Sequence, residues 1–286
     1  GSGHHSLQKH SRQEGAELRK ALTIAESDTS GGAGIKADLK TFQELGVYGM
    51  SALNVIVAMD PNGWSHQVFP LDLDLLERQL VTAFEGVGVD AVKTGMLASA
   101  AVVELVARKL DQYGAERVVI DPVMVCKGTD EVLMPDHAAA IRELLVPRAL
   151  VITPNLFEAA QLAQRPPIRT LDDMRDAAVR IAEAGAKNVL IKGGSRLEGV
   201  EKAVDLFYDG REFTLLEAEK VTHGYTHGAG CTTAAAITAE LAKGAAVADA
   251  VRTAKRFVSA AIRYGFRLNQ YVGSVMHGAL RFHGDA

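Results

Sequence analysis

The chain has 286 residues, of which 48% are hydrophobic, so it is long enough to bury a sizeable core. Its 31 Lys and Arg residues against 35 Asp and Glu residues give a net charge of −4, which offers no broad basic surface for a nucleic-acid backbone or an anionic membrane. We therefore expect a protein that acts on small molecules and binds neither nucleic acid nor membrane.

The apolar stretches and the two cysteines narrow the class of protein further. The longest mainly apolar stretches, such as 231–242, are interrupted by Glu240 and are shorter than the ~20 residues of a membrane-spanning helix. Cys126 and Cys231 are too few and too far apart for a disulfide framework or a paired zinc site. We therefore expect a cytoplasmic protein in a reducing compartment.

Residues 1–20 differ in composition from the rest of the chain. The opening GSGHHSLQKHSRQEG is rich in Gly, Ser, His and charged residues and has no periodicity. We interpret residues 1–20 as the remnant of an expression tag and a disordered N-terminus. No internal repeat or interdomain linker is evident after them, so we expect residues 21–286 to form one domain.

From residue 21 onward, short apolar runs alternate with longer amphipathic segments. This alternation is typical of parallel strands joined by crossover helices. It predicts a three-layer α/β/α fold around a mostly parallel sheet. The strand candidates are ALTIA, LNVIVA, VDAVKT, RVVIDPV, ALVITP and NVLIKG, at residues 21–25, 53–58, 89–94, 117–123, 149–154 and 188–193.

Two of the segments between these runs have clear helical signals. Residues 35–45 place Leu39 and Phe42 on one apolar face, so this helix should cover one face of the sheet. Residues 171–184 follow Thr170, a favourable N-cap residue, and precede Gly185, which can end the helix.

The C-terminal part of the chain predicts a hairpin and two helices. The runs 203–208 and 212–216 flank an Asp-Gly turn, which is a hairpin signal and gives the sheet an antiparallel margin. Alanine-rich helices are expected over 231–243 and 247–264. Their small side chains suit close packing against the sheet.

A glycine-rich turn comes directly before the first of these two helices. In THGAGC, Gly228, Ala229 and Gly230 lead into the start of the helix. Such a turn lets backbone N–H groups and the positive end of the helix dipole face an anion, which would suit a phosphoryl group during transfer. On its own, the motif is explained equally well by an ordinary tight turn.

Two further segments follow predicted strands, at the edge where open α/β sheets bind ligands. The loop 27–34 is neither G-x-G-x-x-G nor a Walker sequence, so it does not support the binding of nucleotide phosphates. Asn155 and Glu158 come at the start of a helix, after the strand that ends at Pro154. An amide and a carboxylate there can hold a triphosphate with its Mg²⁺.

Four motifs together carry a resemblance to a known family: SDTSGGAGIKADLKTFQELGVYGM at 27–50, DPVMVCKG at 121–128, TPNLFEA at 153–159 and THGAGC at 226–231. The chain resembles the hydroxymethylpyrimidine kinases and pyridoxal kinases of the ribokinase-like superfamily over nearly all of residues 21–282. The resemblance implies a ribokinase-like fold and a homodimer. It also implies that ATP, with Mg²⁺, phosphorylates the 5′-hydroxymethyl group of pyridoxal to give pyridoxal 5′-phosphate.

The resemblance is closer to one group within this family. Most ribokinase-like enzymes have a catalytic aspartate where this chain has Cys231, and a second cysteine, Cys126, follows a predicted strand. The pair is similar to that of the dual-cysteine pyridoxal kinases of Gram-positive bacteria, in which one cysteine attacks the aldehyde to form a hemithioacetal. By this resemblance Cys231 is the nucleophile, and Cys126 is its partner on a flap over residues 124–133. Because a helix start lowers a thiol pKa, we expect Cys231 to be a thiolate.

The same resemblance assigns His227, Asp28 and Met96 to the substrate side. His227 would carry a proton or hold the ring oxygen of the substrate. Asp28 would hydrogen-bond the ring, and Met96 would line the pocket. A solvated histidine and a core methionine are the plainer alternatives for His227 and Met96.

On the nucleotide side, the family pattern assigns Asn155 and Glu158 to the triphosphate and its Mg²⁺. Asp121, in DPV, would join Glu158 at the metal, and Lys192, in IKGG, would contact the phosphates. A turn residue at the end of a strand is the alternative interpretation of Asp121.

Glu26 departs from the family pattern, in which glycine is usual at this position. The departure places a bulky, negatively charged side chain beside the substrate loop, and it leaves open a non-catalytic protein that retains the pocket. Within the enzyme class, the alternative is a hydroxymethylpyrimidine kinase, because that ring and its hydroxymethyl arm are similar in size and polarity. A dinucleotide-dependent oxidoreductase ranks last, because no G-x-G-x-x-G follows the first strand.

Overall fold

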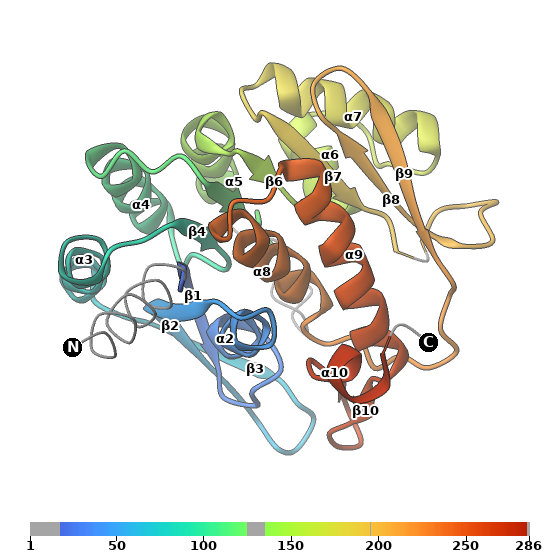
Figure 1. Cartoon of the computed structure of the whole chain (residues 1–286), viewed down its shortest axis with the longest axis horizontal. Coiled ribbons are helices and arrows are strands. Elements are labelled where there is room, and N and C mark those ends of the chain that lie inside the picture. Colours follow the sequence, from blue (N-terminus) through green and yellow to red (C-terminus); the bar gives the residue numbers. More distant parts are fainter. Residues whose placement is uncertain (1–17, 125–134, 195, 285–286) are drawn as a thin grey trace, which may run out of the picture.

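A single nine-stranded sheet runs through the computed structural model, which describes residues 18–124, 135–194 and 196–284 (Figure 1). The strand order is β3-β2-β1-β4-β5-β6-β7-β8-β9. The strands are β1 (Lys20–Asp28), β2 (Tyr48–Met59), β3 (His66–Pro70), β4 (Ala91–Thr94), β5 (Val118–Ile120), β6 (Val151–Ile152), β7 (Asn188–Lys192), β8 (Ala203–Tyr208) and β9 (Phe213–Ala218).

The centre of the sheet is parallel and both of its margins are antiparallel. Strands β2, β1, β4, β5, β6 and β7 pair in parallel, whereas β3, β8 and β9 pair antiparallel with their neighbours. This confirms the mostly parallel sheet and the hairpin after residue 203. The pattern did not predict β3, because four of its five residues are exposed and give no buried face.

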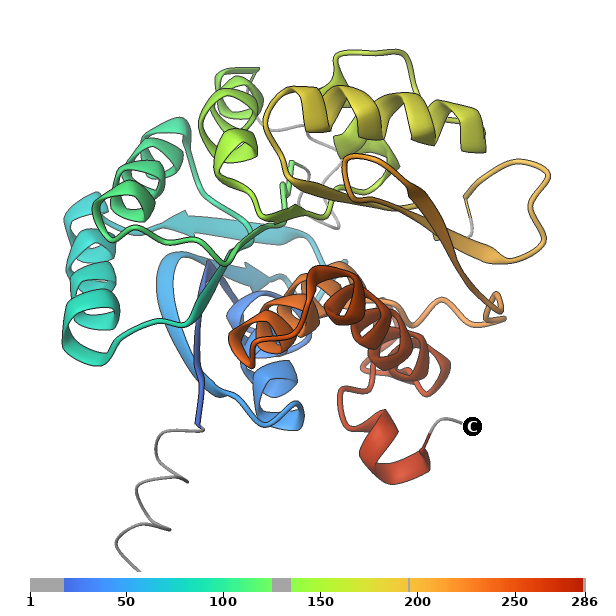
Figure 2. The same cartoon turned by 45° about the horizontal axis from the view of Figure 1, so that its top comes forward.

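Helices cover both faces of the sheet, which confirms the three-layer α/β/α fold (Figure 2). One layer consists of α3 (Leu73–Val81), α4 (Ala100–Gln112), α5 (Pro135–Ala140), α6 (Leu156–Ala163) and α7 (Leu171–Glu183). The other consists of α2 (Gly34–Glu44), α8 (Ala229–Ala242) and α9 (Val247–Arg263). Shorter elements are η1 (Thr82–Val87), η2 (Ile141–Leu145), η3 (Val146–Arg148), β10 (Phe266–Arg267), β11 (Gly273–Ser274) and α10 (Ala279–His283).

Alternate residues of the strands supply the two apolar cores between these layers. In β5, Val118 and Ile120 belong to the core under α4 and α7, whereas Val119 belongs to the core under α8 and α9. All three are fully buried. A strand that is buried on both faces has to be apolar at successive positions, which is why the central strands read as short continuous apolar runs.

The predicted helix signals act as expected at α7. The Thr170 side chain accepts a hydrogen bond from the Asp173 backbone N–H, and the Asp173 carboxylate accepts one from Thr170, a reciprocal capping box. Gly185 follows the helix with φ +124°, which favours glycine.

The ends of the sequence add two smaller findings. β1 already includes Lys20, so the ordered strand begins inside the segment 1–20 that we expected to lie outside the domain; residues 1–17 are outside the described residues. In the parts of the chain that the structure describes, no helix is both long and apolar enough to cross a membrane.

Candidate active site

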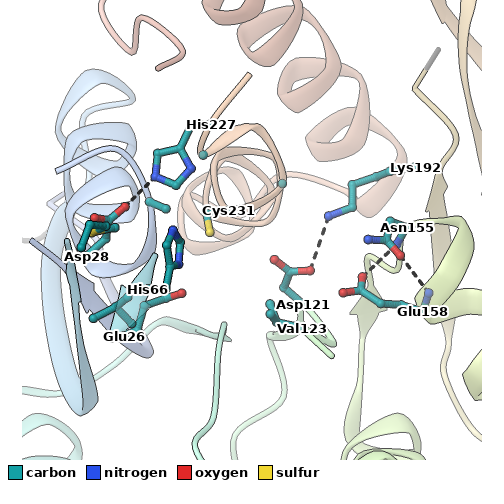
Figure 3. Close-up of a pocket in the computed structure, with 15 residues that line it drawn as sticks. Glu26, Asp28, His66, Asp121, Val123, Asn155, Glu158, Lys192, His227 and Cys231 are labelled. Carbon is teal, nitrogen blue, oxygen red and sulfur yellow. Dashed lines mark hydrogen bonds and ion pairs between the residues drawn. The ribbon is translucent and has the colours of Figure 1, made fainter. Parts of the chain in front are cut away.

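A pocket lies where the parallel strands end (Figure 3). The last residue of β1 is Asp28 and the last of β7 is Lys192, while Asp121 directly follows β5 and Asn155 comes shortly after β6. All four line this pocket, because parallel strands place their carboxyl ends at one edge of the sheet. The start of α8, with Cys231, completes the wall between them.

One side of the pocket, which we call the acceptor side, is formed by Glu26, Asp28 and His227 (Figure 3). The His227 ring Nε2 donates to Asp28 Oδ2 at 2.6 Å, and both side chains are buried. Ser30 donates to Asp28 Oδ1 through its backbone N–H at 2.8 Å and its hydroxyl at 2.7 Å. Burial acts to raise the pKa of Asp28, but the hydrogen bonds from His227 and Ser30 outweigh it, so this pKa lies below its usual range.

The backbone of His227 is held by the C-terminal part of the chain. Its N–H donates to the Gly273 carbonyl at 3.1 Å, and its own carbonyl accepts from the Val275 N–H at 3.2 Å. The His227 ring also packs against the substrate loop, because a Cβ on Gly32 would lie 2.6 Å from its Cδ2. The histidine is therefore a fixed, buried group and not a solvated turn residue.

The glycine turn has a geometry that only glycine adopts easily. Gly228 has φ +89°, and a Cβ on it would lie 1.9 Å from the Gly32 carbonyl oxygen. α8 begins at Ala229, two residues before the predicted start, and no side chain caps it. Its first turn therefore opens onto the pocket with the positive end of the helix dipole.

Cys231 lies in this first turn, and its environment contradicts the expected thiolate. Burial raises the pKa of the Cys231 thiol well above its usual value, and the nearby Glu26 carboxyl adds to the rise. Lys93 acts in the opposite direction but does not reverse the shift. The expectation from the helix start was therefore wrong for the free protein, because desolvation outweighs the dipole.

Lys93 belongs to a buried ion pair that the sequence analysis missed. Its Nζ donates to both oxygens of Asp38, at 2.9 Å each, and the Thr23 hydroxyl donates to Asp38 Oδ2 at 2.6 Å. Burial alone would lower the pKa of Lys93, but the charge of Asp38 outweighs it and raises this pKa. The pair joins β1, β4 and α2 beside the pocket.

Glu26 is buried, which changes its expected charge. Burial, followed by the charge of Asp38, raises the pKa of Glu26 to about 7. The carboxyl that we expected to be fully negative is therefore partly protonated near neutral pH, since a buried carboxylate loses its hydration.

The other side of the pocket, which we call the nucleotide side, is formed by Asp121, Asn155, Glu158 and Lys192 (Figure 3). Asn155 is the N-cap of α6: its side chain accepts from the Glu158 N–H at 2.8 Å, and Glu158 Oε1 accepts from the Asn155 N–H at 2.9 Å. Glu158 Oε2 accepts from the Met124 N–H at 3.3 Å. Burial, with the charge of Asp121, raises the pKa of Glu158 to about 7.

A lysine connects this side to the glycine turn. Lys192 Nζ lies 3.4 Å from Asp121 Oδ1, and a Cβ on Gly230 would lie 3.1 Å from the same Nζ. Burial acts to lower the pKa of Lys192, but the charges of Asp121 and Glu158 raise it. The ammonium group is therefore a fixed cation at the point where the two sides meet.

The donor atoms of the nucleotide side fit Mg²⁺. Asp121 and Glu158 supply carboxylate oxygens and Asn155 an amide oxygen, which are the hard ligands that this ion prefers. The described residues contain no group of three or more His, Cys, Asp or Glu side chains that could hold a metal ion by themselves. Mg²⁺ is usually bound by one or two carboxylates together with phosphates and water, and this set suits that arrangement.

Most of the residues singled out in the sequence meet in this one pocket. Met96 and Ala229 do not line it. Met96 is buried in a small cluster with Val55 and Val57, behind the pocket wall. Cys126 and nearly all of the predicted flap 124–133 lie outside the described residues. The predicted residues in the wall are Asp28, Asp121, Asn155, Glu158, Lys192, His227, Gly228, Gly230 and Cys231.

Sequence analysis missed several other residues of the pocket wall. Val57, Met59 and Val123 give it apolar surface, and His66 reaches it from β3. Burial lowers the pKa of His66. His66 could not be found because its strand was not predicted, and the apolar residues look like any core position in a sequence.

Comparison with known protein families agrees with this geometry. A model of the family described as phosphomethylpyrimidine kinase matches residues 28–276. Pyridoxine kinase of Bacillus subtilis (strain 168) is 59% identical over 265 residues, which are 92% of this chain and 97% of that protein. A hydroxymethylpyrimidine/phosphomethylpyrimidine kinase of the same strain is 44% identical over 264 residues, 92% of this chain and 96% of that protein.

Solved structures give the same result for the fold. The ADP complex of Bacillus subtilis pyridoxal kinase superposes with a TM-score of 0.90 at 58% identity, covering 93% of this chain and all of that chain. The pyridoxal kinase from Staphylococcus aureus in complex with AMP-PCP and pyridoxal has a TM-score of 0.87 at 48% identity, covering 92% and 94% of the two chains.

Proposed function

Because the chain belongs to the phosphomethylpyrimidine kinase family, we propose that it transfers the γ-phosphoryl group of ATP to the 5′-hydroxymethyl group of pyridoxal, which gives pyridoxal 5′-phosphate. The observation that carries this proposal is that the acceptor side and the nucleotide side belong to one pocket and meet at the glycine turn before α8. The relatives solved with ADP, AMP-PCP and pyridoxal support both ligands.

We assign the nucleotide side to ATP and its Mg²⁺. Lys192 would pair with the phosphates, for which its fixed and buried ammonium group is suited. Asp121 and Glu158 would hold the metal ion together with the phosphates, and Asn155 would orient Glu158 through the capping box. The ion would supply positive charge against the phosphate oxygens.

The turn of Gly228, Ala229 and Gly230 would hold the phosphoryl group as it passes between the two sides. The Ala229 N–H donates to the Thr226 carbonyl at 3.1 Å, so the donors would be the N–H groups of Gly228 and Gly230, which line the pocket at the start of a 14-residue helix with no side-chain cap. Fixed donors that face the site of developing charge stabilise a transition state without reorganising. The position of Gly230 beside the Lys192 ammonium group adds a cation at the same place.

We further propose that Cys231 adds to the aldehyde of pyridoxal. Its Sγ would bond to the aldehyde carbon while the thiol proton passes to the aldehyde oxygen, which gives a hemithioacetal. The protonated state of the free thiol is compatible with this step, because the addition conserves the proton. His227, fixed by Asp28, is placed to carry a proton or to hold a ring oxygen, and Cys126 would complete the dual-cysteine pair from the flap.

Two further assignments concern the assembly and the compartment. We propose that the enzyme is a homodimer and that it is cytoplasmic. We also propose that Met96 supports the pocket wall from behind. The sparse cysteines support a reducing compartment.

Phosphorylation of hydroxymethylpyrimidine is a second candidate, which the matching family model and the 44% identical relative favour. Both substrates are flat heteroaromatic rings with a hydroxymethyl arm. The two activities can share one pocket.

Parallel measurements of ATP turnover with pyridoxal, pyridoxine and hydroxymethylpyrimidine test these assignments. We expect Mg²⁺-dependent turnover with the highest kcat/KM on pyridoxal. Higher kcat/KM on hydroxymethylpyrimidine would reverse the order of the two candidates. Absence of turnover on all three would contradict the kinase assignment and leave the non-catalytic alternative.

A further inference from the structure

Glu26 occupies a distorted place in the sheet. The parallel register between β1 and β2 shifts between Ala25 and Glu26, so Ala25 pairs with Leu53 while Glu26 pairs with Val55. The inserted residue, Asn54, is buried, and its amide group donates to the carbonyls of Ala25 and Met96 at 3.0 Å each. A bulge that is locked in this way re-aims a side chain, and such bulges are common next to active sites.

A glycine makes room for the Glu26 carboxyl group. A Cβ on Gly34, where φ is +63°, would lie 2.6 Å from Glu26 Oε1. Gly34 comes next to β1 because an isolated antiparallel bridge joins it to Ser27. The backbone around Glu26 therefore leaves space for a carboxyl group that lines the pocket.

This carboxyl group is not satisfied within the free protein. Glu26 is only 8% exposed, and its Oε1 is shielded from solvent and has no hydrogen-bond partner among the described residues. Lys93, the cation that acts most strongly on it among the described residues, already donates to both oxygens of Asp38. A buried polar atom without a hydrogen-bond partner is costly and uncommon in proteins. A ligand group that donates a hydrogen bond would supply the missing partner.

The charged groups around Glu26 make an added hydrogen-bond donor favourable. Burial is the main cause that raises the pKa of Glu26 to about 7. Asp38 on α2 and Asp28 on the same strand add to the rise, whereas a hydrogen bond from its own backbone and the charge of Lys93 on β4 oppose it. Cys231 of α8 also lies within its electrostatic reach. An N–H or O–H donor from the ligand would replace the water that the carboxyl group has lost.

We propose that Glu26 is a specificity-determining residue, whose carboxyl group accepts a hydrogen bond from a ring N–H or ring O–H group of the acceptor substrate. This inference rests on the proposed function for the identity of the ring. Because Glu26 lines the pocket, a donor on a bound ring can reach its carboxyl group once that group turns about its broad terminal torsion. The chain then favours rings that carry such a donor.

Isothermal titration without ATP tests this assignment with three ligands: pyridoxine, its analogue without the ring hydroxyl group, and its analogue with C–H in place of the ring nitrogen. We expect Glu26→Ala to weaken pyridoxine binding about 10- to 100-fold, the usual range for a buried hydrogen bond that is lost. The loss should be several-fold smaller for the analogue that lacks the donor, as in a double-mutant cycle between side chain and ligand group. The analogue with the smaller loss identifies the donor.

A second variant and a matched control make the result decisive. Glu26→Gln keeps an acceptor oxygen at nearly the same shape, so it should recover most of the binding lost in Glu26→Ala. Val57→Ala, in the same pocket wall, removes apolar contact only and should weaken all three ligands equally. An equal loss on all three ligands in Glu26→Ala, or tighter binding of pyridoxine, would overturn the proposal.

The test separates this inference from the proposed function. Binding of pyridoxine is measured without phosphoryl transfer, whereas the kinase assignment is tested by ATP turnover of the unaltered protein. Turnover on pyridoxal with no selective effect of Glu26 would overturn only the inference. A selective effect of Glu26 on binding without any turnover would support the inference and overturn the kinase assignment.

Discussion

The two sides of the pocket are built in different ways. On the nucleotide side, Asn155 and Glu158 bond to each other across a single helical turn, and these contacts satisfy their polar groups. On the acceptor side, Asp28 meets His227 from 199 positions away in the chain, and Glu26 keeps an unsatisfied oxygen. Local structure therefore orders Asn155 and Glu158, although Lys192 meets Asp121 from 71 positions away. The acceptor side rests on a more distant contact and keeps one unpaired oxygen.

This difference matches the two tasks that we assign to the sides. A triphosphate is the same in every reaction of such an enzyme, so a site whose polar groups already pair with one another can serve it. The acceptor side must discriminate between similar rings. Buried polar groups that are unpaired in the free protein are effective at this, because a wrong ligand leaves them unpaired. Experiments that treat the two sides separately can break or sharpen this comparison.

The largest effect is expected at Cys231, where the sides meet. A thiol can add to the aldehyde of pyridoxal but not to the alcohol of pyridoxine, so Cys231→Ala should lower kcat/KM for pyridoxal by at least about 10²-fold and for the alcohols by much less. Cys231→Asp should raise turnover of the alcohols above Cys231→Ala, since a general base contributes about 10²–10⁴-fold. Steady-state kinetics on the three substrates measures both effects.

The turn itself provides the control for this experiment. Gly228, Ala229 and Gly230 are unchanged in both variants, so Mg²⁺-dependent ATP binding should stay within a few-fold of the original value. The same proportional loss on aldehyde and alcohols in Cys231→Ala would show that Cys231 is not an aldehyde nucleophile.

The next largest effect concerns stability and pH on the acceptor side. Glu26 has a folded-state pKa of about 7 against an ordinary value of 4.5, so the folded protein binds more protons than the unfolded chain between these values. The contribution of Glu26 to stability is fully present below pH 4.5 and is lost as the pH rises toward 7. This loss of unfolding free energy is on the order of 3 kcal/mol, and Glu26→Gln should remove it.

Chemical denaturation at several pH values measures this effect as the difference in unfolding free energy between Glu26→Gln and the unaltered protein. The difference should grow in favour of the variant from pH 4.5 to pH 7. Glu104→Gln, at an exposed glutamate on α4, reports the general effect of removing one carboxylate. A difference that stays constant over this pH range would contradict the raised pKa of Glu26.

The smallest effect separates stability from turnover on the nucleotide side. Glu158 is buried and closes a capping box, so Glu158→Gln should cost about 1 kcal/mol of stability. It should also lower turnover at limiting Mg²⁺ by about 10²-fold, as expected for a lost charge-stabilising group. Thermal unfolding and ATP turnover measure the two effects.

The chain offers a matched control in the second capping box. Asp173 closes the box of Thr170 at the start of α7 and does not line the pocket. Asp173→Asn should cost a similar amount of stability and leave turnover unchanged. If both variants lose stability and neither loses turnover, Glu158 is only a structural residue.

The same contrast explains how much of the structure could be predicted from the sequence. The sheet and its helices follow from local signals, such as the apolar runs of the central strands and the cap at Thr170. β3 was missed because an exposed edge strand needs no apolar face. The start of α8 was placed too late, because a glycine-alanine-glycine turn has no side-chain cap to mark it.

For the pocket, the residues that follow strands or begin helices were predictable, because strand ends meet at one edge of the sheet. The buried pair of Lys93 and Asp38 was not, since the two residues are 55 positions apart and neither segment marks the other as its partner. The state of Cys231 was predicted wrongly, because the amount of burial depends on the whole fold and cannot be read from the residues beside it. His66 was missed together with its strand.

The contact between Asp28 and His227 also has a consequence for how the protein is made. Synthesis of the chain through Lys192 already supplies every side chain of the nucleotide side, whereas the acceptor side needs His227 and the segment at 273–275 that holds it. Contacts between residues so distant in sequence form late, because closing a long loop has a high entropic cost. A nascent chain of that length therefore carries the side chains of the nucleotide side before the glycine turn, His227 and the segment at 273–275 have been made.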